Sequence, residues 1–200
     1  MAVEYENEIG IEYILQKPED DDDPDSYFFS SRDVGERVEE LPGGYEVYED
    51  PEHEVFLVQE GGDPVPEEDV ATVRGALEDI DHLNEYENLY RVETFDDSIW
   101  VYLTDDTPET ITDVINWFPE EEERILDEIS RGNFTYSAYL KFCRGGENRD
   151  TYYVYRRMFS GLQERDSDRW LFVSGEEDIR EAASKYLPHL EQDSFFELGI

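Results

Sequence analysis

The sequence predicts an α+β fold, with a largely antiparallel sheet and helices mainly on one face of it. Segments in which apolar and polar residues alternate predict half-buried strands, and helical periodicities follow the strand pairs. The resulting order is hairpin–helix, hairpin–helix, meander–helix. Helices that cover one face of an antiparallel sheet are the economical packing for that order.

The N-terminal part is expected to contain a strand, an acidic linker and a short helix. Residues 3–15 alternate between apolar and acidic side chains, which is typical of one half-buried strand. Residues 17–25, KPEDDDDPD, combine like charges with two prolines and predict a solvated linker. Residues 31–41 space their apolar side chains along one helical face, and PGG follows to end a helix there.

Two hairpins come next, at residues 45–59 and 89–104, each with two β-rich arms around a polar turn. Their arms lie 44–45 residues apart, so a decayed repeat is one interpretation. The other is that any two hairpins rich in Tyr and Val would look this similar.

A helix is expected after each hairpin. The helix at 66–80 begins with Pro66 and acidic residues, which suit a helix N-terminus. The helix at 107–118 is expected to bury a stripe that ends at Phe118 and to run on, beyond a proline, to Gly132.

The last third predicts a meander followed by a helix. Its strands are expected at 135–143, 150–159 and 169–173, and the helix at 175–187. Ser174 and Glu177 match the spacing of a capping box at the start of that helix. A chain of 200 residues is expected to form a single domain, with 1–44, 45–132 and 133–200 as the alternative sub-units.

The net charge of −38 arises from 54 acidic and 16 basic residues, and only three of the basic residues are Lys. Such an excess repels itself in dilute buffer, whereas molar salt shortens the Debye length to about 3 Å. We therefore expect a protein of a halophilic, archaeal cell, or of a virus or plasmid in one. The alternative is an acidic mimic of nucleic acid, which needs a track of carboxylates but no scarcity of Lys.

The N-terminus shows neither a basic nor an apolar leader region, and no run approaches the roughly 18 apolar residues of a membrane span. These patterns predict a cytoplasmic protein without a membrane partner. Cys143 is the only cysteine, so it forms no internal disulfide, and its place in a strand predicts a buried, inert thiol.

Motifs that would fix a reaction are missing from the sequence. His53, His82 and His189 lie far from one another and from Cys143, so no local pair of metal ligands is present. There is also no phosphate-binding glycine loop and no serine-nucleophile motif. We therefore expect no catalytic residue, no metal and no cofactor, although 54 carboxylates leave a carboxylate-based enzyme of unknown substrate as one alternative.

Charge is segregated along the chain. Residues 131–172 carry eight basic and five acidic residues, a net charge of +3, which leaves −41 for the rest. Within them, RDTYYVYRRMFSG at 149–161 mixes arginine with aromatic residues. Three interpretations compete: internal pairing, a protein interface, and nucleic acid stacked on an aromatic sheet face.

Strand geometry weakens the nucleic-acid interpretation, because neighbouring Arg156 and Arg157 must point to opposite faces of the sheet. Salt weakens it further, since phosphate affinity falls steeply with salt while apolar contacts persist. The sequence thus predicts a non-enzymatic interaction or accessory protein that binds a protein partner, and it leaves the oligomeric state open. A nucleic-acid-associated protein that uses the 135–173 meander is the alternative. The candidate partner-binding residues are Tyr153, Tyr155, Arg157 and Trp170.

Overall fold

The computed structural model describes residues 2–18, 26–61, 64–83, 89–95, 97–104, 113, 115–124, 134–145, 149–158 and 170–199. The chain is a mixed α+β protein with mostly antiparallel sheets, as the sequence predicted. It forms two compact units, Met1–Asp63 and Pro64–Ile200, whose boundary differs from those of the expected sub-units. No helix in the described ranges is long and apolar enough to cross a membrane.

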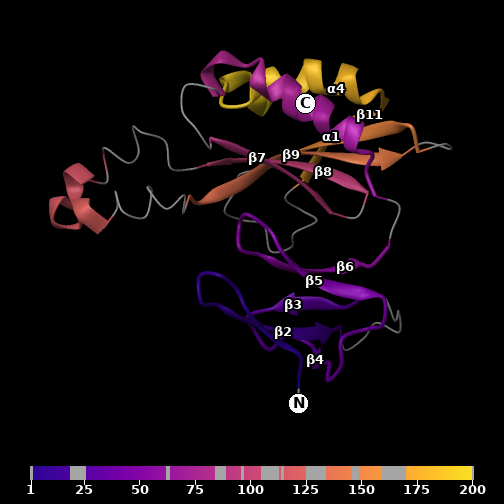
Figure 1. Ribbon diagram of the computed structural model, residues 1–200, viewed down its shortest axis with the longest axis vertical. Helices are drawn as coiled ribbons and strands as arrows, with labels where there is room; N and C mark the ends of the chain where they lie inside the picture. The colour runs from indigo at the N-terminus through magenta and orange to yellow at the C-terminus, as the bar shows by residue number, and fades with distance from the viewer. Residues whose placement is uncertain are drawn as a thin grey trace. The chain divides into compact units, whose positions relative to one another are not determined.

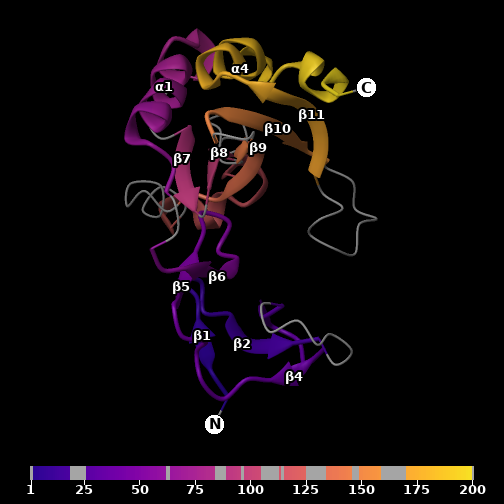
Figure 2. The same ribbon diagram turned by 90° about the vertical axis from the view of Figure 1, so that its right-hand side faces the viewer.

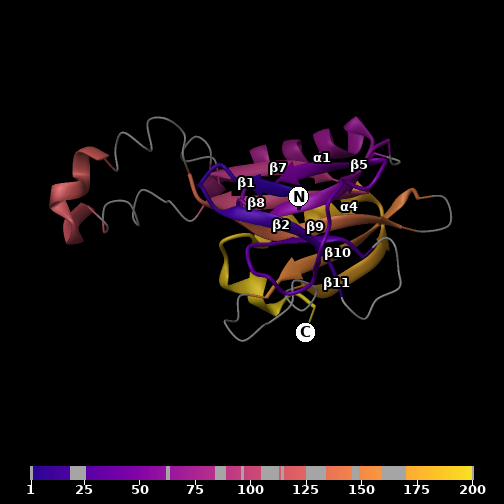
Figure 3. The ribbon, with the colours of Figure 1, turned by 90° about the horizontal axis from the view of Figure 1, so that it is seen from below.

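The larger unit is built on one five-stranded antiparallel sheet. Its strands are β7 (Tyr90–Phe95), β8 (Ser98–Thr104), β9 (Tyr136–Gly145), β10 (Thr151–Arg157) and β11 (Trp170–Glu177). Each strand pairs with the next along the chain, so the order β11-β10-β9-β8-β7 is a simple meander (Figures 2 and 3). The predicted second hairpin and the predicted C-terminal meander are therefore parts of the same sheet.

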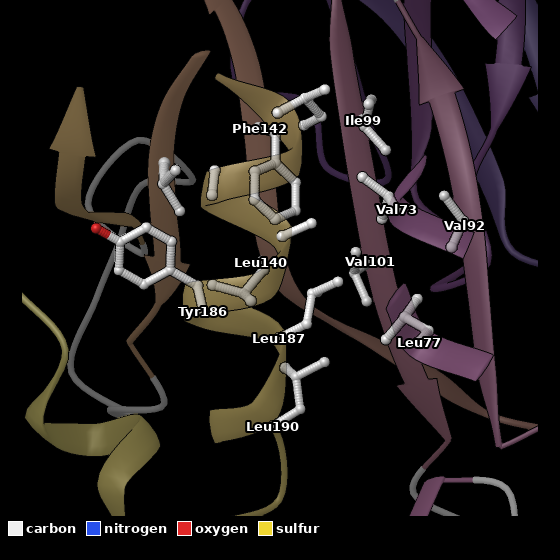
Figure 4. Close-up of a cluster of buried hydrophobic side chains, with 14 of the residues drawn as sticks. Val73, Leu77, Val92, Ile99, Val101, Leu140, Phe142, Tyr186, Leu187 and Leu190 are labelled. Carbon is white, nitrogen blue, oxygen red and sulfur yellow. The ribbon is translucent and has the colours of Figure 1, made fainter. Parts of the chain in front are cut away.

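Two helices cover one face of this sheet, as expected (Figure 1). They are α1 (Glu67–Glu78) and α4 (Ile179–Tyr186), and short 3-10 helices flank them at η1 (Asp81–Leu83), η4 (Leu187–His189) and η5 (Asp193–Glu197). Val73 and Leu77 of α1 meet Val101 of β8, and Leu140 and Phe142 of β9 lie among the side chains from α4 and η4 (Figure 4). Burial of such aliphatic and aromatic groups stabilises the fold by roughly 1.5–3 kcal/mol per side chain.

The start of α4 corrects the predicted capping box. Strand β11 continues through Glu177, and the helix begins only at Ile179. Asp178 is the N-cap, and its carboxylate accepts a hydrogen bond from the backbone N–H of Arg180 at 2.9 Å. Ser174 and Glu177 do form a hydrogen bond, but between their side chains on the strand. The sequence thus shows the spacing of a capping box at Ser174, four residues before the N-cap that the structure uses, Asp178.

A bulge in β9 alters which side chains face the helices. Val101 pairs with Leu140, whereas the next residue, Tyr102, pairs with Ala138, so Tyr139 is an extra residue in the ladder. Leu140 belongs to the core beneath the helices, and Ala138 belongs to a separate cluster on the other face. Strict alternation along the sequence would have placed both on one face.

The described residues of the smaller unit form six short strands. Strands β1 (Glu4–Glu6), β2 (Glu12–Lys17), β3 (Phe28–Ser30) and β4 (Glu36–Arg37) form one sheet around β2. Strands β5 (Tyr45–Glu49) and β6 (Val55–Gln59) form the predicted first hairpin, which is a separate two-stranded sheet. Residues 19–25, most of the predicted acidic linker, lie outside the described residues.

The predicted single strand at 3–15 is wrong, because a turn divides it into β1 and β2. Asn7 is buried and makes the turn: its side-chain oxygen accepts from the Ile11 N–H at 2.7 Å, and its carbonyl accepts from Gly10 at 2.9 Å. Gly10 has φ +81°, a conformation that glycine adopts without strain. Alternation continues through the turn, which is why the pattern concealed it.

The predicted helix at 31–41 is also wrong. The buried Gln16 side chain accepts hydrogen bonds from the N–H groups of Val34 (2.8 Å) and Gly35 (2.6 Å) and donates to the carbonyl of Arg32 (2.6 Å). These bonds hold the segment extended against β2. A side chain at Gly35 would collide with the carbonyl of Lys17, and Val34 is 61% exposed instead of buried.

Most of the predicted helix at 107–118 lies outside the described residues. Phe118, the expected end of its buried stripe, is 51% exposed and has the non-helical φ of −131°. A 3-10 helix, η2 (Pro119–Glu121), follows it. Phe118 was therefore wrongly assigned to the core, because its periodicity continues past the point where Pro119 ends the helical backbone.

Candidate functional site

The four candidate residues lie on the sheet face turned away from α1 and α4. Along β10, buried Tyr152, Val154 and Arg156 point toward the helices, so half-buried Tyr153, Tyr155 and Arg157 point the other way. Trp170 of β11 is the direct cross-strand partner of Arg157. The structure thus brings all four together, while their binding role stays a prediction.

Other aromatic side chains lie on this face of the sheet, which we call the aromatic face. Its members are Phe95, Trp100, Tyr102, Tyr136, Tyr153, Tyr155, Trp170 and Phe172. Trp100 stacks on Phe95 with ring centroids 4.5 Å apart and meets the edge of Trp170 at 5.0 Å. Tyr155 meets Phe172 at 5.7 Å, and Phe172 is 51% exposed. The aromatic face therefore extends from buried rings on β8 to an accessible ring on β11.

Lys141 stands in the middle of the aromatic face. Its ammonium lies 4.5 Å from the ring centroid of Trp170, 4.8 Å from that of Trp100 and 5.5 Å from that of Tyr155. A cation among three rings gains about 0.5–2 kcal/mol per favourable contact, depending on how far it is desolvated. Lys141 is thus a cation–π group, as is Lys185, which lies 4.8 Å from the ring centroid of Tyr186.

Tyr153 is positioned by two glycines. A β-carbon added at Gly145 of β9 or at Gly175 of β11 would overlap the Tyr153 ring, so the ring extends over both neighbouring strands. Glycine is unfavourable inside strands, but an aromatic ring that covers it compensates for the missing side chain. The position of Tyr153 on the aromatic face therefore depends on both strands beside it.

The three central strands contain no acidic residue. Strands β8, β9 and β10 carry neither Asp nor Glu, in a chain that has 54 of them, yet they include Lys141, Arg144, Arg156 and Arg157. Burial cannot explain this difference, because it would keep basic residues out of these strands as well as acidic ones. On β7, Arg91 stacks over the Tyr136 ring at 4.4 Å, and Glu93, opposite Trp100, is the acidic residue on this face of that strand. On the aromatic face itself, Arg91, Lys141 and Arg157 stand beside two acidic residues, Glu93 and Glu176, and Glu176 lies 3.5 Å from the Tyr153 hydroxyl.

Two further arginines of the basic segment, Arg149 and Arg156, make structural contacts. Arg156 is buried, and it donates to the carbonyls of Leu198 (2.7 Å), Phe196 (3.0 Å) and Arg157 (3.3 Å). Burial lowers its pKa from the ordinary value. Arg149 pairs with Asp97 at 2.8 Å. Internal pairing was predicted, but for Arg156 the acceptors are backbone carbonyls rather than carboxylates.

Sequence reasoning did not find Lys141 or Trp100. Trp100 lies in the hydrophobic middle of a strand, and its indole Nε1–H is buried without a hydrogen-bond acceptor among the described residues. Such a donor is rare in native proteins. The scarcity of Lys was a usable signal for Lys141, because a lysine kept where almost all others are missing indicates a specific contact.

Cys143 is half-buried on the same face, opposite Ser98. Burial raises the pKa of its thiol, although a hydrogen bond with Ser98 partly opposes that shift. A thiol with a raised pKa is protonated at neutral pH and is a poor nucleophile. This supports the predicted inert role.

Glu177 connects β11 to α4. Its carboxylate accepts hydrogen bonds from Tyr186 (2.8 Å), Lys185 (3.1 Å) and Ser174. Burial raises the pKa of this carboxyl, but the three hydrogen bonds outweigh burial and leave the pKa below its ordinary value. A hydrogen bond with Arg37 likewise lowers the pKa of Asp33. A general acid would need a raised pKa, so neither residue supports the carboxylate-enzyme alternative.

We expect Glu177→Gln to lower the free energy of unfolding by about 1–2 kcal/mol at neutral pH, because the amide accepts these bonds more weakly. The lowered pKa means that the carboxylate's stabilisation is complete above the unfolded pKa, near 4.3, and is lost as pH falls through the folded pKa. Thermal unfolding of both proteins between about pH 7 and pH 3 measures this. A difference that stays constant over that range would contradict the prediction.

The histidines occupy different parts of the structure. His189 ends η4, and its Nδ1 is hydrogen-bonded to Ser194 Oγ at 2.8 Å. His53 lies in the turn of the β5–β6 hairpin, with its Nδ1 2.8 Å from Glu49 Oε1. Glu8 completes a group of three metal-ligand side chains in the smaller unit. Sequence spacing could not indicate this group, because Glu8 and Glu49 are 41 residues apart.

A scan of protein-family models found no match to this chain, and neither did searches of curated proteins and of solved structures.

Proposed function

We propose that this chain is a non-enzymatic interaction protein that binds an acidic protein partner through the aromatic face. The observation that carries the proposal is that Tyr153, Tyr155, Arg157 and Trp170 share one sheet face, on which Lys141 contacts the rings of Tyr155 and Trp170. Tyr, Trp and Arg are the residues enriched at the energetic centres of protein interfaces. Phe172 gives this cluster an accessible edge.

The charge pattern favours a partner that presents carboxylates beside apolar groups. Strands β8, β9 and β10 lack acidic residues, whereas the chain as a whole carries −38. At molar salt, attraction between charges acts only over about 3 Å, so ion pairs contribute where groups touch. Apolar and cation–π contacts persist there. Cytoplasmic halophilic localisation is the setting in which this combination is most useful.

The test is affinity capture with the full-length protein in about 2 M KCl from a halophilic archaeal lysate. The wild type is compared with a Tyr155→Ala/Arg157→Met variant. Arg180→Met is the matched control, because it removes one positive charge from an exposed position on α4. We expect one protein to be retained stoichiometrically by the wild type and the control and to be lost from the variant.

Bound material is analysed for protein and for nucleic acid. Retention of the same protein by the variant, with its fold unchanged by circular dichroism, would contradict the proposal. If the variant only loses stability, Tyr155 and Arg157 are structural groups and the interface is not where we place it.

One observation favours a second candidate, a single-stranded nucleic acid on the same surface. Aromatic rings on a sheet face opposite the helices can stack bases. Arg156 is buried on the other face, and Lys141 contacts three rings, so the aromatic face lacks the row of cations that a phosphate backbone would need. We therefore place the protein partner first. Quenching of tryptophan fluorescence by an oligonucleotide that persists in about 2 M KCl would reverse this order.

A further inference from the structure

The smaller unit brings together three side chains of the types that bind transition metals. The ligand atoms of Glu8, Glu49 and His53 all lie within 4.8 Å of one another. Glu8 follows β1, Glu49 ends β5, and His53 belongs to the turn that leads into β6. The group therefore joins the β1–β2 hairpin to the β5–β6 hairpin.

The hairpin turn directs the imidazole toward Glu49. The buried Asp50 carboxylate accepts from the N–H groups of Glu52 and Glu54, both at 2.9 Å, and closes the turn. His53 then has φ 62°, the left-handed conformation in which the chain reverses. Its Nδ1 lies 2.8 Å from Glu49 Oε1.

Contacts from the first hairpin hold the Glu49 carboxylate and the turn in place. Tyr5 donates its hydroxyl to Glu49 Oε2 at 3.2 Å, and the Glu8 N–H points at both carboxylate oxygens, at 3.0 and 3.2 Å. Asn7 donates to the carbonyl of His53 at 2.8 Å. Hydrogen bonds of this kind orient metal ligands before the ion binds.

An additional cross-link would also suit the composition of the smaller unit. Among its described residues, the buried apolar side chains are Leu15, Pro51 and Val55, while Asn7, Gln16 and Asp50 are buried polar groups. Units of about 60 residues bury a smaller share of their unfolded surface than larger domains do, and a metal or a disulfide often stabilises units of this size. The single cysteine, Cys143, is in the other unit.

We propose that Glu8, Glu49 and His53 bind a divalent transition metal of the Zn²⁺ type and that the ion ties the two hairpins together. One imidazole nitrogen and two carboxylates form a donor set for zinc, and the nitrogen disfavours Mg²⁺ and Ca²⁺. Two ligand atoms of a tetrahedral zinc ion lie about 3.3 Å apart, so the Nδ1–Oε1 pair has to open by only about half an ångström. Glu8, which is exposed, supplies the third ligand by a change of rotamer.

The test is calorimetric titration of metal-stripped, full-length protein with ZnCl₂ in about 2 M KCl. A large excess of MgCl₂ is present, because the many exposed carboxylates would otherwise bind zinc weakly and without order. We expect one zinc ion per chain. His53→Gly removes the imidazole without backbone strain, and it should weaken zinc binding by at least about 100-fold.

Glu8→Gln is the second variant, because Glu8 is exposed and its replacement should leave the fold intact. This variant should weaken zinc binding by roughly 10-fold or more. Glu6→Gln, which makes the same charge change two residues away, and His189→Gln are the matched controls. Zinc should raise the unfolding temperature of the wild type and of both controls, and that of neither site variant. Zinc binding that is undiminished by His53→Gly and Glu8→Gln, or an absence of one-to-one binding in the wild type, would overturn the proposal.

Discussion

Arg156→Met should lower the free energy of unfolding by about 2–4 kcal/mol. Methionine replaces the apolar stem of the arginine, but the carbonyls of Phe196 and Leu198 lose their charged donor in a buried place. Hydrogen bonds to charged groups each contribute about 1.5–3 kcal/mol, and leaving an acceptor buried without a partner adds to the cost. The C-terminal η5 segment should detach as a result.

Urea unfolding at constant KCl measures this effect. All three tryptophans, Trp100, Trp117 and Trp170, belong to the larger unit, so their fluorescence reports that unit alone. The matched control is the neighbouring Arg157→Met, which removes the same charge from the aromatic face and should change stability by less than about 1 kcal/mol. Equal losses of unfolding free energy in the two variants would contradict the description of Arg156 as buried and Arg157 as lying on the opposite face of β10.

Lowering KCl from about 2 M to 10 mM should unfold the chain, and the smaller unit should unfold first. The Debye length grows from a few ångströms to about 30 Å over this range, so repulsion among the carboxylates becomes long-ranged. Residues 1–63 contain 21 acidic and three basic residues, a net charge of −18, whereas the 137 residues after them carry −20. The smaller unit therefore has about twice the charge per residue, and it has fewer buried apolar side chains.

Far-ultraviolet circular dichroism follows both units, and tryptophan fluorescence follows the larger one. We expect the circular dichroism to change at a higher KCl concentration than the fluorescence does. If the chain unfolds, salt contributes at least about 5 kcal/mol to its free energy of unfolding, which is the lower end of ordinary protein stability. Sucrose without salt should not substitute for KCl if the cause is electrostatic. A chain that stays folded in 10 mM KCl would contradict the halophilic interpretation.

The strands of the larger unit were predictable because each repeats a simple local pattern. In α1, Val70, Val73 and Leu77 repeat at helical spacing and are buried. The local pattern gave a wrong prediction wherever the hydrogen bonds of one buried polar side chain fix the conformation of the backbone. Asn7 divides the first predicted strand, and Gln16 converts a helical periodicity into an extended segment.

The candidate site was predictable in part for the same reason. The alternation of β10 separates Arg156 from Arg157, and the sequence shows that alternation directly. The position of Lys141 among Trp100, Trp170 and Tyr155 depends on the register of three strands and on the bulge in β9. Similarly, Glu8 reaches Glu49 and His53 only through the pairing of distant hairpins. Contacts of this range are not encoded in any short window of the chain.

The ring of Tyr153 over Gly145 and Gly175 has a consequence for how this sequence can change over time. A methyl group at either glycine is excluded while the ring is present, and loss of the ring uncovers two glycines within strands. Neither step is neutral alone. The three positions are therefore expected to change together during evolution. In descendants of this chain, the glycines at 145 and 175 should be replaced only together with, or after, replacement of Tyr153 by a smaller residue.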